Sequence, residues 1–362
     1  MFRTSYFLIR KRKFISFNNG LTASDFPLQP HPYMPMVYKA NHIIPAGDEK
    51  CKYMHPERGY VAYGLKTNSI GFLNGEKGDR EIINPKPQGL VRINCLGESP
   101  VAGYLRYQNK YYSLPVEVER YLQHRMTHSP IEVNNFAQGA WSSCDLMINF
   151  LLRVYETNPD VLIIYAGFND LSISLKPNFM PDYSHAKQNF EAKYRALEFM
   201  DKLPKLPLAI YNFVLSEITK KFINNIDVSL TTNIGQANYD ASFQNLVVYK
   251  RNIEHIIKVC LMSQIEVVLV SSLYFISHFN KKLKIANKMQ EGMQLINGHL
   301  TNLSRQYNVL YVDLHGQVPL DKEYFYDSVH FSHSGAELVG RVIGKCIEPL
   351  IKRIALSKSE IK

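Results

Sequence analysis

The sequence predicts an α/β protein, folded as a three-layer α/β/α sandwich around a mostly parallel five-stranded sheet. From Val91 onward, short apolar runs alternate with longer amphipathic segments, the pattern of strands joined by crossover helices. Two of these runs, at residues 161–166 and 266–271, are rich in Val, Ile and Leu. Such composition is typical of parallel strands that helices cover on both faces.

The positions of the individual elements follow from the spacing of the apolar residues. Strands are expected at residues 91–96, 131–135, 161–166, 266–271 and 309–313. Helical spacing predicts helices at residues 115–126, 142–157, 243–262, 284–307 and 334–354. Pro159 ends the second helix before the third strand, because proline lacks an amide donor and disfavours helical geometry in the preceding residue.

Two segments lie outside this alternation. Residues 1–90 are rich in Tyr, Pro and Gly, and we expect an N-terminal extension that packs on a domain of residues 91–355. Residues 171–240 separate the third strand from the next helix and are expected to be a helical insertion. A connection of this length is usually functional, so residues 186–222 are a candidate lid, with a packing insertion remote from any site as the alternative.

Composition and charge restrict the class of protein. Apolar residues make up 46% of the chain and charged residues 20%, which is typical of a folded protein rather than a disordered one. The net charge of +10 favours anionic partners, but we find no nucleic-acid motif and expect no nucleic-acid partner. The densest basic run, Arg10, Lys11, Arg12 and Lys13, is either a solvated tail or a weak contact with an anionic membrane surface.

The cysteines and the apolar stretches bear on compartment and metal binding. The 5 cysteines are widely spaced and lack both C-x-x-C and zinc-ligand spacing, so neither a disulfide framework nor a zinc site is expected. Cys95, Cys144 and Cys260 lie in apolar segments, where we expect buried thiols. We see no signal peptide and no stretch of about 18 apolar residues that would span a membrane, and a cytoplasmic location is favoured.

Ser99 is a candidate nucleophile. Gly97-Glu98-Ser99 follows the first predicted strand directly, and open parallel sheets bind ligands beyond the carboxyl ends of their strands. Gly97 permits a tight turn, and Pro100 suits the first position of a helix. A serine after a glycine is common, so this tripeptide needs support from the rest of the chain.

Two further turns are expected at the same edge of the sheet. Residues 134–139 follow the second strand, and residues 167–170 follow the third. The Ser99 amide, the Gly139 amide and the Asn169 side-chain amide could converge there as donors to an oxyanion, which acyl transfer requires. Each turn is also compatible with a purely structural role, since Gly and Asn favour turns in general.

A candidate base and its partner follow the last strand, in the sequence Asp327-Ser328-Val329-His330. The three-residue offset lets one turn present His330 to a serine, while Asp327 fixes the tautomer and supports the imidazolium. Metal binding by Asp327, His330 and His333 is the alternative, although no other ligand cluster accompanies them. Ser99, His330 and Asp327 are therefore the candidate triad.

Four blocks together resemble the SGNH/GDSL family of serine esterases and lipases, of the bacterial type with an N-terminal extension. They are glycine-acid-serine, a glycine block, Gly-x-Asn-Asp and Asp-x-x-His, in that order, each just after a predicted strand. The four residues that name the family would be Ser99, Gly139, Asn169 and His330. The resemblance covers residues 91–353 and implies a flavodoxin-like strand order, ester hydrolysis and no metal or organic cofactor.

The sequence departs from the family pattern at three positions. Glu98 replaces the usual Asp, Pro100 replaces a residue that could donate an amide, and Ala137 stands where similar sequences often carry a glycine. The nucleophile, the base and the other donors remain, so we expect altered loop geometry rather than inactivity. The position of Gly139 in the glycine block is uncertain by one residue for the same reason.

The expected function is hydrolysis of a carboxylic ester through an acyl-enzyme, with a small acyl group such as acetyl on a glycan or glycoside as the favoured substrate. A lipid esterase, an O-acyltransferase and a catalytically silent glycan- or membrane-binding module are the alternatives. Trp141, Phe168 and Tyr274 lie near strand ends and either stack on a sugar or pack the core.

Overall fold

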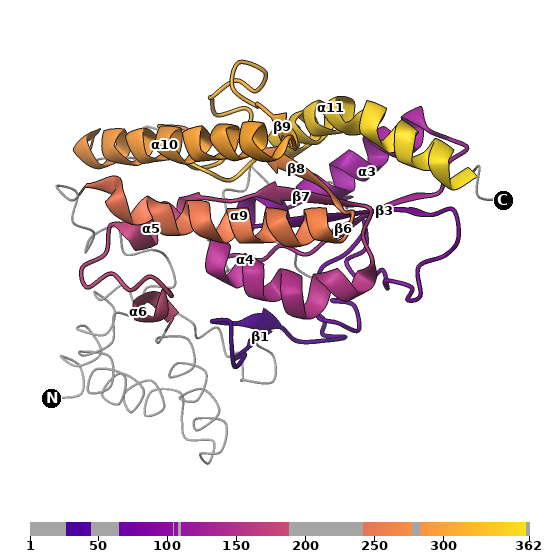
Figure 1. Cartoon of the computed structure of the whole chain (residues 1–362), viewed down its shortest axis with the longest axis horizontal. Helices are drawn as coiled ribbons and strands as arrows, with labels where there is room; N and C mark the ends of the chain where they lie inside the picture. Colours follow the sequence, from indigo (N-terminus) through magenta and orange to yellow (C-terminus); the bar gives the residue numbers. More distant parts are fainter. Residues whose placement is uncertain are drawn as a thin grey trace, which may run out of the picture.

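The computed structural model describes residues 27–44, 65–103, 105–107, 110–187, 242–276 and 283–359. Within these residues the central sheet has five strands in the order β6-β3-β7-β8-β9, and all neighbouring strands are parallel. The first strand of the sheet lies between the second and the third, which is the flavodoxin-like order. The predicted three-layer α/β/α sandwich is confirmed (Figure 1).

The strands begin and end within one residue of the expected positions. They are β3 (Val91–Gly97), β6 (Ile131–Asn135), β7 (Val161–Tyr165), β8 (Glu266–Val270) and β9 (Leu310–Val312). Two small antiparallel pairs lie outside the sheet, β1 (Leu28–Gln29) with β2 (Val37–Tyr38) and β4 (Leu105–Tyr107) with β5 (Lys110–Tyr112).

Long helices cover both faces of the sheet (Figure 1). On one face, α3 (Leu114–Arg125) and α11 (His333–Ser359) pack on the strand residues that include Val91, Ile93 and Cys95. On the other face, α4 (Ser143–Asn149), α9 (Leu246–Met262) and α10 (Leu283–Tyr307) pack on residues that include Leu96. Among the described residues, shorter helical segments are α2 (Ser99–Ala102), α5 (Phe168–Ser174), α6 (Ser184–Lys187) and the 3₁₀ turn Phe243–Asn245 before α9.

The helix predicted at residues 142–157 changes its winding along its length. It begins as α4, continues as a π-helical turn over Phe150–Val154 and ends as a 3₁₀ turn over Tyr155–Thr157. At its start, the Asp145 carboxylate accepts from both the amide and the hydroxyl of Ser142, at 2.8 and 2.7 Å. It ends where Asn158 adopts the left-handed conformation (φ 53°), just before Pro159.

Glycine brings α11 close to α3. A Cβ atom at Gly340 would lie 2.3 Å from Cβ of Glu117, and one at Gly344 would lie 2.5 Å from Cδ1 of Tyr121. Such distances are too short for any side chain, so the two helices can only approach this closely with glycine at both positions.

The described parts of residues 1–90 contact the central domain at several points. The Trp141 indole donates to the Met36 carbonyl at 2.9 Å, and the Asn74 side-chain amide donates to Oδ1 of Asn134 in β6 at 3.0 Å. The fully buried ring of Phe72 packs edge-on against Phe136, with ring centroids 4.8 Å apart. These N-terminal residues therefore share the core that lies beneath α4.

Most of the expected helical insertion, residues 188–241, lies outside the described residues, as does most of the candidate lid at residues 186–222. The residues on either side of it meet. The Asn245 side-chain amide donates to the Ser174 carbonyl at 2.9 Å, and the Arg251 guanidinium donates to the Pro181 carbonyl at 2.9 Å. The described residues on either side of the insertion are therefore adjacent.

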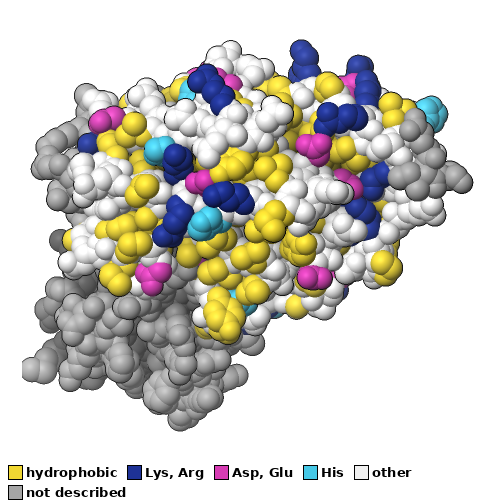
Figure 2. Space-filling model, viewed as in Figure 1, with side chains coloured by type: hydrophobic (Ala, Val, Ile, Leu, Met, Phe, Trp, Pro, Cys, Tyr) yellow, Lys and Arg dark blue, Asp and Glu magenta, His cyan; other side chains and the backbone are white. Residues whose placement is uncertain are grey.

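The helices, the cysteines and the surface charges of the described residues can be compared with what the composition predicts. Among the described helices, none has the length and apolar content needed to cross a membrane. The thiols of Cys95, Cys144 and Cys260 are buried, as predicted. Figure 2 shows Lys, Arg, Asp and Glu side chains intermingled with apolar ones on one face of the molecule, rather than a field of one sign. The basic run Arg10 to Lys13 lies outside the described residues.

Candidate active site

Ser99 is the first residue of α2, immediately beyond the carboxyl end of β3. The amides of Val101 and Ala102 both donate to the Glu98 carbonyl at 3.0 Å, which begins the short helix. Gly97 supplies room rather than an unusual backbone angle: a Cβ atom there would lie 2.3 Å from Cγ2 of Val101 and 2.8 Å from the Tyr165 carbonyl. The strand can therefore turn sharply into the helix and present Ser99 at the sheet edge.

The structure brings Ser99, His330 and Asp327 together. Nε2 of His330 lies 2.8 Å from Oγ of Ser99, and Nδ1 lies 2.6 Å from Oδ2 of Asp327. The other carboxylate oxygen of Asp327 accepts from the backbone amides of Val329 and His330, both at 2.9 Å. All three side chains of the candidate triad are half-buried, so solvent reaches the site.

The electrostatics of this arrangement favour an ionised Asp327. Burial acts to raise the pKa of its carboxyl, but the hydrogen bond to His330, the charge of His330 and the two amides outweigh burial and hold the pKa below its usual value. An ionised Asp327 only accepts hydrogen bonds, so Nδ1 of His330 carries a proton, and in the neutral imidazole Nε2 is then the acceptor for the Ser99 hydroxyl. The Tyr326 ring stacks on the imidazole, 5.3 Å away and inclined by 6°, which also fixes the ring orientation.

The candidate oxyanion donors lie at the ends of three neighbouring strands. Ser99 follows β3, Gly139 lies in the turn after β6, and Asn169 is the second residue of α5, after β7. Asn169 is thus helical rather than part of an open turn. Its side chain is 8% exposed and donates to the Trp141 carbonyl at 2.8 Å, which uses one of the two N–H groups of the amide.

The glycine block overlaps the end of the strand expected at residues 131–135. Asn134 and Asn135 are the last two residues of β6, and the turn begins after them. The Asn135 side-chain amide donates to the Ala102 carbonyl at 2.9 Å, and its Oδ1 accepts from the Ala137 amide at 3.1 Å. Asn135 therefore ties the end of α2 to the turn that carries Gly139, a role that the sequence analysis missed.

Pro100 fits into α2 without the loss of a helical hydrogen bond. It is the second residue of α2, where a backbone N–H would have no partner within the helix. Replacing an ordinary residue by proline at this position therefore removes no helical hydrogen bond.

Of the three aromatic residues considered for stacking on a sugar, Trp141 is fully buried in the core and its indole N–H is taken by Met36, so the stacking role is wrong for it. Tyr274 is also buried, and Phe168 stacks on it with centroids 6.2 Å apart and an interplanar angle of 18°. Phe168 is half-buried and keeps some exposed surface next to Asn169.

The alternative metal site is not assembled. Both ring nitrogens of His330 are engaged by Ser99 and Asp327, and the ring of His333 packs edge-on against Tyr112 at 5.9 Å. In the part of the chain that the structure describes, no group of three or more His, Cys, Asp or Glu side chains is placed to hold a metal ion.

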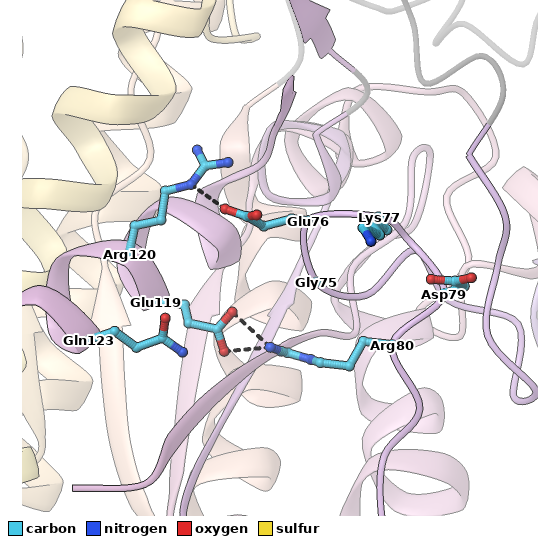
Figure 3. A pocket seen from close by; sticks show the side chains of 8 residues that line it. All are labelled: Gly75, Glu76, Lys77, Asp79, Arg80, Glu119, Arg120 and Gln123. Carbon is cyan, nitrogen blue, oxygen red and sulfur yellow. Dashed lines mark hydrogen bonds and ion pairs between the residues drawn. The ribbon is translucent and has the colours of Figure 1, made fainter. Parts of the chain in front are cut away.

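A polar hollow of about 340 Å³ lies between residues 75–80 and α3, and none of the candidate triad residues lines it (Figure 3). Two ion pairs cross it: Arg80 contacts both carboxylate oxygens of Glu119, at 2.6 and 2.7 Å, and Arg120 contacts Glu76 at 2.8 Å. The hollow is a seam between the N-terminal residues and α3, and its main charges are paired with each other.

Comparison with known proteins gives structural likeness at low sequence identity. No protein-family profile and no curated protein match the sequence. A GDSL-like lipase from Bacteroides thetaiotaomicron is 15% identical, with 72% of this chain and 88% of that chain covered and a TM-score of 0.42. A lipase/acylhydrolase from Enterococcus faecalis is 16% identical, with 72% and 96% covered and a TM-score of 0.42.

Axe2, an acetylxylan esterase from Geobacillus stearothermophilus, is 14% identical, with 71% of this chain and 94% of that chain covered and a TM-score of 0.44. The chain is similar in structure to GDSL-type lipases and acylhydrolases.

Proposed function

We propose that this protein is a serine hydrolase that cleaves carboxylic esters through an acyl-enzyme. The observation that carries the proposal is the continuous hydrogen-bonded chain from Asp327 through His330 to Ser99, at the carboxyl edge of a parallel sheet. A nucleophile in contact with a base, and a base oriented by a third group, is the arrangement that activates a serine hydroxyl.

In the proposed reaction, Nε2 of His330 takes the Ser99 proton as Oγ attacks the ester carbonyl. The resulting tetrahedral oxyanion is stabilised by the Ser99 and Gly139 amides and by the Asn169 side-chain amide. His330 then returns the proton to the departing alcohol, which leaves the acyl group on Ser99. Water, deprotonated by His330, attacks this acyl-enzyme and releases the carboxylic acid and free Ser99.

The favoured substrate is a small acyl ester, such as an acetyl ester, on a glycan or glycoside. Support comes from Phe168, whose half-buried ring next to Asn169 keeps some exposed aromatic surface, the kind of surface that packs on the apolar side of a sugar ring. A lipid esterase and an O-acyltransferase use the same triad chemistry and differ in the leaving group or the acceptor.

The central assignment is tested by comparing the parent with Ser99→Ala in hydrolysis of p-nitrophenyl acetate. Turnover should fall by at least about 10³-fold, because the nucleophile is removed. Ser357→Ala, at an exposed serine near the end of α11, is the control and should keep parental turnover. A fluorophosphonate probe should label the Ser99 peptide of the parent only. Undiminished turnover in Ser99→Ala would reject the proposal.

The substrate class is tested with acetylated glycosides, monoacylglycerols and a sugar acceptor in parallel. A glycan esterase should release acetate from the acetylated glycosides with the highest kcat/KM. Preference for the monoacylglycerols would assign a lipid esterase, and acetylated acceptor in excess of free acetate would assign a transferase. Ligand binding without any turnover would indicate a silent binding module.

A further inference from the structure

Glu98, the residue before Ser99, directs its side chain away from its own helix. It is 2% exposed, and its carbonyl begins α2 while its carboxylate makes no capping bond there. The carboxylate instead reaches the turn at the end of β7, the neighbouring strand in the sheet. A buried carboxylate next to the nucleophile therefore contacts a different loop.

The contacts of this carboxylate are with the backbone at the start of α5. Oε1 accepts from the Gly167 amide at 2.8 Å, and both oxygens accept from the Asn169 amide, at 3.3 and 3.2 Å. Amides at the beginning of a helix have no partner within the helix, so Glu98 satisfies two such donors at once and fixes where α5 begins.

Asn169 is held from its other side as well. Its side chain donates to the Trp141 carbonyl at 2.8 Å, and the next residue, Asp170, accepts from the Ser143 amide at 2.8 Å and from the Tyr183 hydroxyl at 2.8 Å. The turn also lies against α10, since a Cβ atom at Gly167 would lie 2.6 Å from Cγ2 of Ile296. Glu98 directly precedes the nucleophile, and its carboxylate links this turn to the end of β3.

Burial of the Glu98 carboxyl next to Asp170 carries a free-energy cost. Burial, and then the nearby Asp170 carboxylate, raise the pKa of the Glu98 carboxyl, while the backbone amides at the start of α5 act in the opposite direction. Burying two carboxyl groups close together costs free energy that an apolar pair would not cost. Groups with strongly shifted pKa values cluster at functional sites, and Glu98 directly precedes the candidate nucleophile.

We propose that Glu98 is a positioning residue for the esterase reaction: by binding the amides of Gly167 and Asn169, it sets the distance between Ser99 and the Asn169 side-chain amide. It touches no reacting atom. The proposal rests on the proposed function. It also gives a physical reason for glutamate at this position, because an aspartate has one methylene fewer and its carboxylate would stop short of these amides on the present backbone.

The test is a double-mutant cycle on p-nitrophenyl acetate hydrolysis with the full chain, using Glu98→Asp, Asn169→Ala and the combination. Alone, Glu98→Asp should lower kcat by roughly 10-fold or more while KM changes by less than about 3-fold, because a displaced oxyanion donor acts on the transition state. In the Asn169→Ala background the same change should lower kcat by less than about 2-fold, because residues that act through one another are not additive.

Two further variants separate positioning from folding. Glu98→Gln keeps the side-chain length but replaces one acceptor oxygen by a donor, and should give a smaller loss of kcat than Glu98→Asp. Glu119→Gln is the matched control, since Glu119 is also buried and accepts a backbone amide, that of Val133 at 2.9 Å, away from the triad. It should change Tm but leave kcat near the parental value.

Three results would overturn the proposal: an equal kcat loss from Glu98→Asp in both backgrounds, parental kcat with only a lower Tm, or a loss of kcat in Glu119→Gln as large as that in Glu98→Asp. These outcomes differ from failure of the proposed function, which would appear as undiminished turnover in Ser99→Ala.

Discussion

Oδ2 of Asp327 lies 2.6 Å from Nδ1 of His330, and Oδ1 of the same carboxylate accepts from the backbone amide of His330 at 2.9 Å. One aspartate thus binds both the ring and the main chain of the same histidine, three residues further on. The bond from the His330 amide closes the turn, and the bond from Nδ1 orients the ring. The imidazole is therefore held in place before substrate binds.

The first prediction follows from this contact. Asp327→Asn keeps the size of the side chain but removes its charge and permits the wrong imidazole tautomer, so kcat for p-nitrophenyl acetate should fall by about 10²- to 10⁴-fold. The control is Asp321→Asn, which changes an exposed aspartate in the same loop region and should leave kcat within about 2-fold. Parental kcat in Asp327→Asn, with the fold verified by circular dichroism, would contradict the role of Asp327.

The second prediction concerns Asn169. Asn169→Ala should lower kcat by about 10²- to 10³-fold if its amide is an oxyanion donor. The variant also loses the bond to the Trp141 carbonyl, so a decrease of about 1 kcal/mol in the free energy of unfolding is expected as well. Urea unfolding and steady-state kinetics on the same samples separate the two effects. A loss of activity no larger than the loss of folded protein would assign Asn169 a structural role only.

The third prediction concerns pH and Glu117. Burial, together with Glu337 and Glu76 and against the effect of Arg120, raises the pKa of Glu117 from 4.5 to about 7. The folded state therefore binds this proton more tightly than the unfolded state, and the stability it contributes is complete below pH 4.5 and is lost as the pH rises through 7. In the parent, this should lower the free energy of unfolding by roughly 1–3 kcal/mol across that range.

The measurement is urea unfolding at four pH values from about 5 to 8 for the parent, Glu117→Gln and Glu156→Gln. Glu117→Gln should show a flatter dependence on pH, whereas Glu156→Gln, at an exposed glutamate, should follow the parent. Identical pH profiles for all three proteins would show that Glu117 does not titrate in this range.

The fourth prediction concerns the contact between α11 and α3. Gly340→Ala places a methyl group 2.3 Å from Cβ of Glu117 and should lower the free energy of unfolding by about 1–3 kcal/mol. Gly298→Ala is the matched control, because Gly298 is helical and exposed and a Cβ atom there meets nothing within 4 Å. That change should raise stability by roughly 0.5–1 kcal/mol through helix propensity. Equal effects of the two substitutions would contradict the close packing.

The fold could be predicted from the sequence because β7 and most of β8 are compact runs of β-branched and apolar residues, the other strands are short segments between helical patterns, and each long helix has a regular apolar stripe. The parts that were missed depend on contacts between distant residues. α5 begins where Glu98 and not a local residue binds its first amides, and the burial of Trp141 depends on Met36. No local pattern in the sequence marks such partners.

In the candidate active site, too, the residues with a local sequence pattern were predicted and the contacts between distant residues were not. Asp327 and His330 are three residues apart and were found from their spacing, and Ser99 was found from its place after a strand. The structure brings His330 to Ser99 across 231 positions of the chain, as parallel topology leads one to expect. The connecting contacts of Asn135 and Glu98 could not be inferred, because an Asn or Glu beside a turn is equally compatible with exposure to solvent.

The bonds from Asn245 to Ser174 and from Arg251 to Pro181 have a consequence for how this protein could diverge. The two ends of the connection are already adjacent, and the entropy of closing a loop grows only with the logarithm of its length. A change in the number of residues between these two contacts would therefore alter the loop-closure entropy only slightly and leave the sheet register unaltered. Proteins descended from a common ancestor could keep the same sheet and triad while exchanging this one segment wholesale.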